Sequence, residues 1–257
     1  MTRTVPRENS PFWWQADWRQ AGGRHAESRG LRLGFTSVTA GNLGRHVGDP
    51  QDAEANRRAL ERHLGQPTGT LQFLHQTHSA DVVDASTYPS GGPASTGDAW
   101  ISPTGQHALA ILVADCLPVL FTAEGRGGAL LTAAAHAGRP GLLAGILDNT
   151  LQALREAGAE RITAWIGPGA CGQCYEIPED MVAEIAAERP AIRSQTRWGS
   201  AALDLRAEAV RILTAAGADV VDLGGCTIED PRLFSHRRSQ QQGEPAGRIA
   251  AVICPSR

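Results

Sequence analysis

The sequence contains no lysine. All 24 of its basic residues are arginine, beside 27 acidic residues in a chain of 257. The absence of lysine excludes a Schiff-base lysine, a lysine general base and the lysine of a Walker-type phosphate loop. Any bound anion must therefore be held by arginine, histidine, backbone amides or a metal ion.

Cysteine, long apolar runs and surplus charge are also scarce. Five cysteines are too few, and odd in number, for a disulfide scaffold, which favours a cytoplasmic protein. No apolar run approaches the ~20 residues of a membrane-spanning helix, and residues 1–30 lack the apolar core of a signal peptide. With a net charge of −3, we expect neither nucleic acid nor a membrane as a partner.

Strand and helix patterns are mixed along the chain without a regular βαβ rhythm. Such a mixture predicts one α/β domain of mixed β-sheets with helices packed outside. Residues 1–30, polar and rich in tryptophan, are expected to lie over the surface as an N-terminal arm, and residues 31–257 to form a single catalytic domain. Helices are expected over 52–64, 142–157, 179–188 and 204–215, and strands over 31–38, 71–76, 108–115, 119–122, 129–135, 162–166, 220–223 and 248–254.

Three potential metal ligands stand where predicted strands give way to turns, namely His78, Cys116 and His136. Two imidazoles and one thiolate suit zinc, with a fourth position open for water or substrate. We therefore predict one zinc ion bound by these residues, although each alone is also typical of packing at a strand end. His75 should face away from His78 in an extended segment, in the core or behind a ligand. Asp115 is expected either to hold a ligand histidine in one tautomer or to cap a turn.

Other metal chemistries fit the sequence less well. A type 1 copper site usually needs an axial methionine, but the chain has two methionines, one of them the initiator, and none of its eight histidines forms a His-x-His pair. The segment His25-Ala26-Glu27 matches half of a zinc deaminase signature, yet no proline directly precedes Cys171. The pair Cys171 and Cys174 is interpreted as a turn with two buried thiols, with a redox motif as the alternative.

Taken in order, these segments resemble the laccase-domain family, long labelled multicopper polyphenol oxidoreductases and now read as zinc-containing purine nucleoside phosphorylases. The resemblance implies phosphorolysis of adenosine, inosine and guanosine to base and ribose 1-phosphate, with adenosine deamination and methylthioadenosine cleavage as accompanying activities. It is carried by Gly41-Asn42-Leu43, His46-Val47-Gly48-Asp49, Asn56-Arg57, His78, Cys116, His136-Ala137-Gly138, Ile166-Gly167-Pro168, Tyr175-Glu176-Ile177, Asp204-Leu205, Cys226-Thr227, Phe234-Ser235-His236-Arg237-Arg238 and Gly247-Arg248. The family's Trp-Arg-Gly after the fourth block is Arg139-Pro140-Gly141 here.

The helix predicted over 52–64 carries Arg57 on the same face as its apolar residues. A buried arginine needs an anion or a carbonyl partner, and its planar fork suits phosphate. Asn42 and His46 lie in the glycine-rich loop that leads into this helix. We therefore predict Asn42, His46 and Arg57 as the substrate cradle; an internal ion pair between Arg57 and a carboxylate such as Asp49 is the alternative.

The remaining candidates complete the predicted site. Asp115 is included in the catalytic set, and Arg139 and Arg237 are further substrate-binding candidates, although the loop of Arg237 is also typical of a solvated surface. Purine nucleosides and phosphate are the expected partners of a monomer or small homo-oligomer. Three rival functions stay open: a hydrolase in which a histidine activates Cys116 as nucleophile, a copper-dependent phenol oxidase, and a metal-binding module without catalysis.

Overall fold

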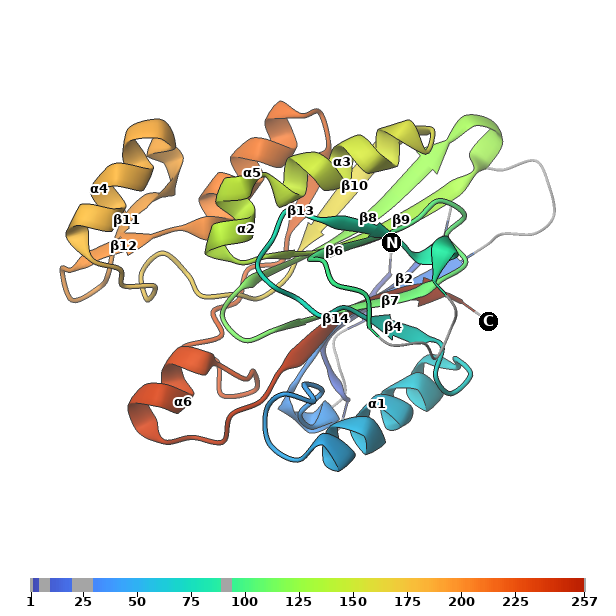
Figure 1. Cartoon of the computed structure of the whole chain (residues 1–257), viewed down its shortest axis with the longest axis horizontal. Helices are drawn as coiled ribbons and strands as arrows, with labels where there is room; N and C mark the ends of the chain where they lie inside the picture. The colour runs from blue at the N-terminus through green and yellow to red at the C-terminus, as the bar shows by residue number, and fades with distance from the viewer. Residues whose placement is uncertain (1, 5–9, 20–29, 89–93, 257) are drawn as a thin grey trace.

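The computed structural model describes residues 2–4, 10–19, 30–88 and 94–256. These residues build four layers, in the order helix, sheet, sheet, helices (Figure 1). Helix α1 (Pro50–Leu64) covers one sheet, and helices α3 (Ile146–Glu156) and α5 (Leu205–Ala215) cover the other. The predicted α/β fold of mixed β-sheets with helices packed outside is confirmed.

The first sheet has the strand order β1-β2-β3-β14-β7-β4. Its pairings are antiparallel except that between β4 and β7. The last strand of the chain, β14, thereby lies at the centre of the sheet, between β3 and β7. The strands are Thr2–Thr4 (β1), Phe12–Arg19 (β2), Gly30–Thr36 (β3), Leu71–Phe73 (β4), Ala108–Val113 (β7) and Ile249–Pro255 (β14).

The second sheet has the strand order β13-β10-β8-β9-β6-β5 and mixes parallel with antiparallel pairs. Its strands are Val82–Asp84 (β5), Ala99–Ser102 (β6), Leu117–Gly125 (β8), Leu130–Ala137 (β9), Ala159–Ile166 (β10) and Asp219–Asp222 (β13). A separate hairpin pairs Arg193–Gln195 (β11) with Ala201–Leu203 (β12).

Three further helices complete the described elements, namely α2 (Arg139–Ala144), α4 (Glu179–Glu188) and α6 (His236–Gln242). The helix predicted over 142–157 is in fact two helices, because Gly145 between them has a φ of 95°, a left-handed conformation that ends α2. The helix predicted over 52–64 begins two residues earlier, where the Asp49 carboxylate accepts a hydrogen bond from the amide of Gln51 at 2.7 Å.

Residues 12–19 do not lie over the surface as was expected for the 1–30 segment. They form β2, which pairs with β3, and Phe12, Trp14 and Ala16 are buried. The alternation of these buried residues with more exposed ones is the pattern of a strand with one face in the core. This part of the 1–30 segment therefore belongs to the first sheet. That the rest, 31–257, forms a single catalytic domain stays a prediction.

The core between the two sheets joins apolar side chains from both. Leu33, Ile111 and Ile253 of the first sheet pack with Leu120 and Trp165 of the second. Chain segments that pass from one sheet to the other therefore cross at the rim of this core, and two of them, between β4 and β5 and between β7 and β8, carry predicted site residues. None of the helices in the described part of the chain has the length and hydrophobicity needed to cross a membrane.

The buried Glu208 of α5 joins the helical layer to the segment after α4. Its carboxylate accepts hydrogen bonds from Arg189 at 2.9 Å and from Arg211 at 2.7 and 2.9 Å. The bond from Arg211 outweighs burial and, with Arg189, holds the pKa of Glu208 below its ordinary 4.5. A carboxyl with a depressed folded-state pKa stabilises the fold above its unfolded pKa and loses that contribution as the pH falls through the folded value.

We expect Glu208→Gln to lower the free energy of unfolding by about 1.5–3 kcal/mol at neutral pH, the usual range for hydrogen bonds to charged groups. The difference from the unaltered protein should shrink as the pH falls below 4.5. Urea unfolding over a pH series measures it, with Glu184→Gln on the exposed face of α4 as the control. A loss that stays constant down to acid pH would contradict the assignment.

Candidate metal centre and anion-binding cavity

The three predicted metal ligands lie together at the rim between the two sheets. His78 comes from the segment between β4 and β5, Cys116 from the turn between β7 and β8, and His136 from the end of β9. Their potential ligand atoms all lie within 4.8 Å of one another. The Sγ of Cys116 is 3.6 Å from Nε2 of His78, and the two imidazole centroids are 4.7 Å apart. His136 is buried and His78 exposed, so the group opens to solvent on the His78 side.

A fully buried carboxylate, Asp98, organises this group from behind. One of its oxygens accepts hydrogen bonds from Nδ1 of His136 at 2.7 Å and from the amide of His78 at 3.0 Å. The other accepts from the amides of Thr77 and Ser79, at 3.0 and 2.7 Å. Because Nδ1 of His136 is engaged, Nε2 is the nitrogen left for a metal, the usual arrangement behind a metal-binding histidine.

The electrostatics of the group favour a thiolate. Burial alone would raise the pKa of Cys116, but hydrogen bonds with His136 and His78 outweigh it and lower that pKa from 9.0 to about 6. Burial likewise opposes the charged form of His136, yet Asp98 and Cys116 raise its pKa to about 9. A thiolate and two imidazoles on the open side of a buried carboxylate are a donor set that fits zinc. The residues present therefore fit the predicted metal.

Backbone geometry brings the ligands close. His78 and Asp115 are the described non-glycine residues with positive φ, at 61° and 85°, a conformation that costs free energy and is concentrated at functional sites. Gly138 has an ordinary φ of −68°, but a Cβ there would lie 2.5 Å from Cδ2 of His78 and 3.1 Å from Sγ of Cys116. The ligands thus pack against a position that only glycine leaves open.

Asp115 takes the second of its two expected roles. Its carboxylate accepts a hydrogen bond from the Thr227 hydroxyl at 2.7 Å and one from the amide of Arg237, in the first turn of α6, also at 2.7 Å. It therefore caps that turn and joins the loops behind Cys116. The ligand histidine is held by Asp98 instead, and the signal for Asp98 is an aspartate placed between a glycine and the buried strand β6.

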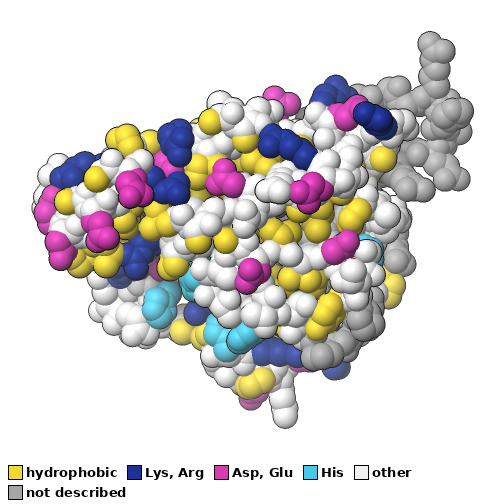
Figure 2. Space-filling view, turned by 45° about the horizontal axis from the view of Figure 1, so that its top comes forward, with side chains coloured by type: hydrophobic (Ala, Val, Ile, Leu, Met, Phe, Trp, Pro, Cys, Tyr) yellow, Lys and Arg dark blue, Asp and Glu magenta, His cyan; other side chains and the backbone are white. Residues whose placement is uncertain are grey.

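The metal group forms part of the wall of a cavity of about 710 Å³. Its other wall is cationic or titratable, and Figure 2 shows histidine side chains exposed on this face with arginine beside them. The lining there includes His46, Arg57, His75, His236 and Arg248. None of the described residues that line the cavity is an aspartate or a glutamate.

Among the described residues, no carboxylate forms a hydrogen bond or salt bridge with Arg57 or Arg248, although the charges of Glu54 and Glu61 act on Arg57 and that of Asp115 acts on Arg248. Arg57 donates to the Leu43 carbonyl at 2.8 Å and lies over the Phe73 ring, 3.8 Å from its centroid. Burial lowers the pKa of Arg57 to about 10 and also lowers that of Arg248. No hydrogen bond or salt bridge joins Arg57 to Asp49, the example named for an internal ion pair, because the Asp49 carboxylate caps α1.

The loop before α1 arranges the other cradle candidates. Both ends of the Asn42 amide are engaged: it donates to the carbonyls of Gly44 and Val47 and accepts from the amides of Gly44 and Arg248. Asn42 therefore shapes the loop rather than facing the cavity. His46 does line the cavity, and partial burial, together with the charges of Arg248 and Arg57, lowers its pKa.

Two cavity residues differ from expectation. His75 was expected in the core or behind a ligand. It forms a β-bridge with Thr96, but the chain leaves the extended conformation before His78, whose φ is 61°. His75 is therefore exposed and lines the cavity together with His78. Arg248 was noted only as part of a family block; its signal is an arginine directly before the apolar strand β14.

Arg139 and Arg237 lie away from Arg57, beside Tyr175. Arg139 contacts the Sδ of Met181, and Arg237 donates to the Glu176 carbonyl at 3.2 Å. Burial raises the pKa of Tyr175, and the charges of Arg139 and Arg237 only partly oppose this rise. Neither arginine belongs to the described lining of the cavity. The segment His25-Ala26-Glu27 lies outside the described residues.

A family model described as "Multi-copper polyphenol oxidoreductase laccase" matches residues 30–256. The chain belongs to this family. Its relatives include proteins named purine nucleoside phosphorylase from Streptomyces coelicolor, 39% identical over 240 residues (88% of this chain, 98% of the relative), and from Corynebacterium glutamicum, 39% identical over 234 residues (86% and 94%).

Solved structures of family members share the fold. YlmD from Geobacillus stearothermophilus superposes with a TM-score of 0.74 at 29% identity, covering 94% of this chain and all of that chain. A Neisseria meningitidis protein gives 0.72 at 30% identity, covering 93% and 98%.

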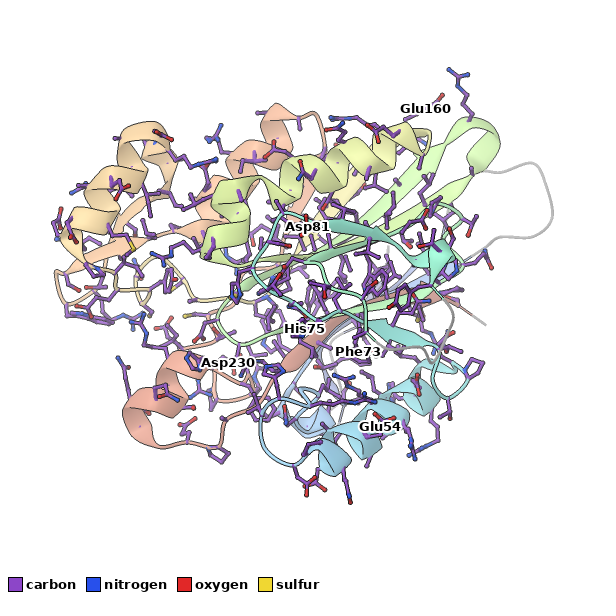
Figure 3. The ribbon with its side chains drawn as sticks, in the orientation of Figure 1. Glu54, Phe73, His75, Asp81, Glu160 and Asp230 are labelled. Atoms are coloured by element: carbon purple, nitrogen blue, oxygen red, sulfur yellow. The ribbon has the colours of Figure 1, made fainter. Side chains whose placement is uncertain are left out.

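We expect Asp98→Asn to weaken metal binding by about 10–100-fold, the usual effect of losing the partner behind a metal-binding histidine. The asparagine amide cannot accept from His136 and from three backbone amides at once. Titration of the metal-free protein with zinc and a competing chelator measures the affinity. The control is Asp81→Asn, which removes an exposed carboxylate from the segment that carries His78 (Figure 3). Equal zinc affinities in the two variants would contradict a role of Asp98 in metal binding.

Proposed function

We propose that this protein is a zinc-dependent purine nucleoside phosphorylase, which converts adenosine, inosine or guanosine and phosphate to free base and ribose 1-phosphate. The observation that supports this proposal is one cavity of about 710 Å³ whose lining includes the His–Cys–His group together with Arg57 and Arg248. The names of the relatives support the same reaction. Cytoplasmic location and a monomeric or small homo-oligomeric state stay predictions.

The cationic wall suits the phosphate co-substrate. In a chain without lysine, the forks of Arg57 and Arg248 can bind phosphate oxygens bidentately. His46, whose pKa is lowered, accepts or donates a hydrogen bond there without adding charge at neutral pH. Because the lining holds no described carboxylate, the nucleophilic anion meets no carboxylate charge there. These residues would therefore bind phosphate and orient it toward the ribose.

The His–Cys–His group of the cavity suits the leaving base. Phosphorolysis develops positive charge on the ribose and negative charge on the departing purine, as in other cleavages of glycosidic bonds. Zinc held by His78, Cys116 and His136 would supply a Lewis acid that polarises the base or a bound water. Asp98 would hold His136, Asn42 would hold the loop of His46, and Asp115 would hold the turn of Cys116. Arg139 and Arg237 stay candidates for substrate binding, although neither lines the described cavity.

The two accompanying activities place different demands on the cavity. Cleavage of methylthioadenosine needs the same phosphate cradle. Adenosine deamination needs a group that carries a proton, and zinc deaminases use a glutamate for this. Since no described lining residue is a carboxylate, His46 or His75 would have to serve. We therefore propose deamination as a side activity only.

A Cys/His hydrolase is the second candidate, on one specific observation. Hydrogen bonds connect the Cys116 thiolate to the His136 imidazole and that imidazole to the Asp98 carboxylate, which is the arrangement of an activated nucleophile. Iodoacetamide discriminates the two functions: a zinc-bound Cys116 resists alkylation until the metal is removed, whereas a free nucleophile reacts in the protein as isolated.

Copper-dependent phenol oxidation has less support. Met181, the internal methionine, contacts Arg139 rather than the metal group, so the axial ligand of a type 1 copper site is missing there.

The proposal is tested by incubating the purified protein with inosine, with and without phosphate, and separating the products by HPLC. We expect hypoxanthine and ribose 1-phosphate in equal amounts, and only with phosphate. Phosphate-independent release of hypoxanthine would replace the phosphorylase with a hydrolase. Loss of zinc after Cys116→Ser, measured by elemental analysis, tests the metal separately.

We expect Arg57→Lys to raise the KM for phosphate, because the charge remains but the bidentate fork is lost, and Arg57→Ala and Arg248→Ala to raise it further. Zinc content and the melting temperature should stay unchanged. Arg58→Ala, which removes the exposed neighbour that pairs with Glu54, is the control. If Arg57→Ala folds, binds zinc and keeps its phosphate dependence, the cradle lies elsewhere.

A further inference from the structure

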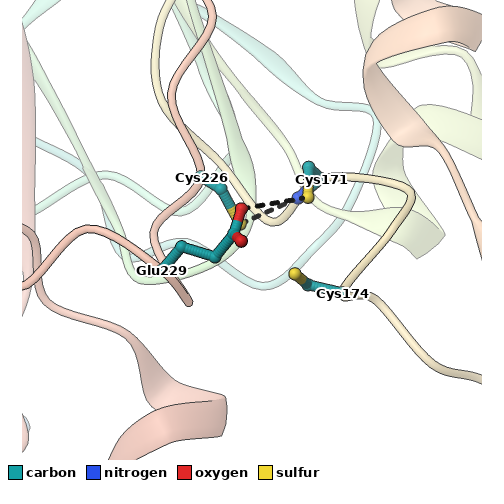
Figure 4. A group of neighbouring side chains, drawn as sticks. All are labelled: Cys171, Cys174, Cys226 and Glu229. Atoms are coloured by element: carbon teal, nitrogen blue, oxygen red, sulfur yellow. Dashed lines mark hydrogen bonds between the residues drawn. The ribbon is translucent and has the colours of Figure 1, made fainter. Parts of the chain in front are cut away.

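A second group of metal-binding side chains lies outside the cavity. Cys171 and Cys174 come from the loop after β10, and Cys226 and Glu229 from the loop after β13. Their sulfur and carboxylate oxygen atoms all lie within 4.8 Å of one another, as Figure 4 shows. Cys174 and Cys226 are buried, and Glu229 lies at the exposed side.

The two loops present these side chains from turns of the same build. In the first turn, the amides of Cys174 and Tyr175 both donate to the Cys171 carbonyl, each at 2.9 Å. In the second, the amides of Glu229 and Asp230 donate to the Cys226 carbonyl, at 3.2 and 2.9 Å. Each turn thus offers one ligand at its first and one at its fourth residue, the Cys-x-x-Cys spacing of structural zinc sites.

The turns are also held side by side. Gly169 and Cys226 form a parallel β-bridge, with hydrogen bonds from the Gly169 amide to the Gly225 carbonyl and from the Thr227 amide to the Gly169 carbonyl. The amide of Cys171 donates to the Sγ of Cys226 at 3.5 Å. An amide that points at a sulfur stabilises its thiolate form, which is the form that binds a metal.

One described cation borders this group of side chains. Arg197, from between β11 and β12, forms an ion pair with Glu229 and donates to the Sγ of Cys174 at 3.6 Å. About half of the Arg197 side chain is exposed, so this single guanidinium borders the four ligands from outside.

We propose that Cys171, Cys174, Cys226 and Glu229 bind a second zinc ion in a closed structural site. Three thiolates and one carboxylate complete a tetrahedral zinc shell and leave no open position. Binding involves no oxidation: the thiol protons pass to solvent as the zinc–sulfur bonds form. This site is independent of the phosphorylase proposal, since none of its four ligands lines the described cavity.

The second zinc would stiffen the support of the first centre. The loop after β10 reaches Asp115 through the Ala170 amide, which donates to the Asp115 carbonyl at 2.8 Å. The loop after β13 reaches the same residue through the Thr227 hydroxyl. Asp115, at a φ of 85°, directly precedes Cys116. A metal that ties the two loops together would therefore hold the strained turn that presents Cys116.

Elemental analysis of protein purified without chelator tests this proposal. We expect two zinc ions per chain, one after Cys174→Ser, one after Cys116→Ser, and none in the double variant. Arg197→Ala is the matched control: it removes the neighbouring cation but no ligand, and should retain both ions. A single zinc that disappears with Cys116→Ser would overturn the second site.

Two further measurements keep the test valid if Cys174→Ser does not fold. Cobalt added to metal-free Cys116→Ser protein should give a sulfur-to-cobalt charge-transfer band, which only the second site can then supply. Thiol titration of the denatured, unreduced protein should find all five cysteines reduced. A missing cobalt band, or two thiols lost to a disulfide, would contradict the proposal whatever the assay with inosine shows.

Discussion

The site depends on one buried carboxylate. Asp98 is fully enclosed, and it receives the imidazole of His136 together with the backbone of residues 77–79. One aspartate thereby connects a strand of the second sheet to the segment that crosses from the first. A buried charge is tolerated only when it is fully hydrogen-bonded. The hydrogen bonds that Asp98 accepts therefore hold His78 and His136 beside Cys116.

The positive charge of the cavity comes from arginine, because the chain contains no lysine. Arginine stays charged when partly buried, whereas a buried lysine loses its proton readily. Arg57 and Arg248 line the same cavity as the metal group. With a metal ion bound there, such a cavity would hold an anion near a Lewis acid, as the proposed attack of phosphate on a nucleoside requires.

The sequence predicts those parts of the site that follow from local pattern. Cys116 and His136 could be located because each stands at the end of an apolar strand, and His78 because it follows the strand predicted over 71–76. Arg57 could be located because helical periodicity assigns its face. Asp98 and Arg248 each stand directly before a buried strand, but their importance comes from contacts distant in sequence, which that weak local signal does not reveal. His75 was misplaced because the chain leaves the extended conformation before His78, and β2 was missed because tryptophan-rich polar segments do not resemble core strands. The break at Gly145 shows the same limit, since a left-handed glycine inside a helical pattern is visible only in the backbone.

The central claim is that zinc at His78, Cys116 and His136 and phosphate at Arg57 and Arg248 occupy one cavity. Diffraction at the zinc absorption edge, from crystals of the protein grown with phosphate, tests it most directly. The account predicts an anomalous peak within bonding distance of Cys116 Sγ and of Nε2 of both histidines, with phosphate against both guanidinium groups across the same cavity. No anomalous peak at the three ligands, or phosphate bound only beside Arg139 and Arg237, would contradict it.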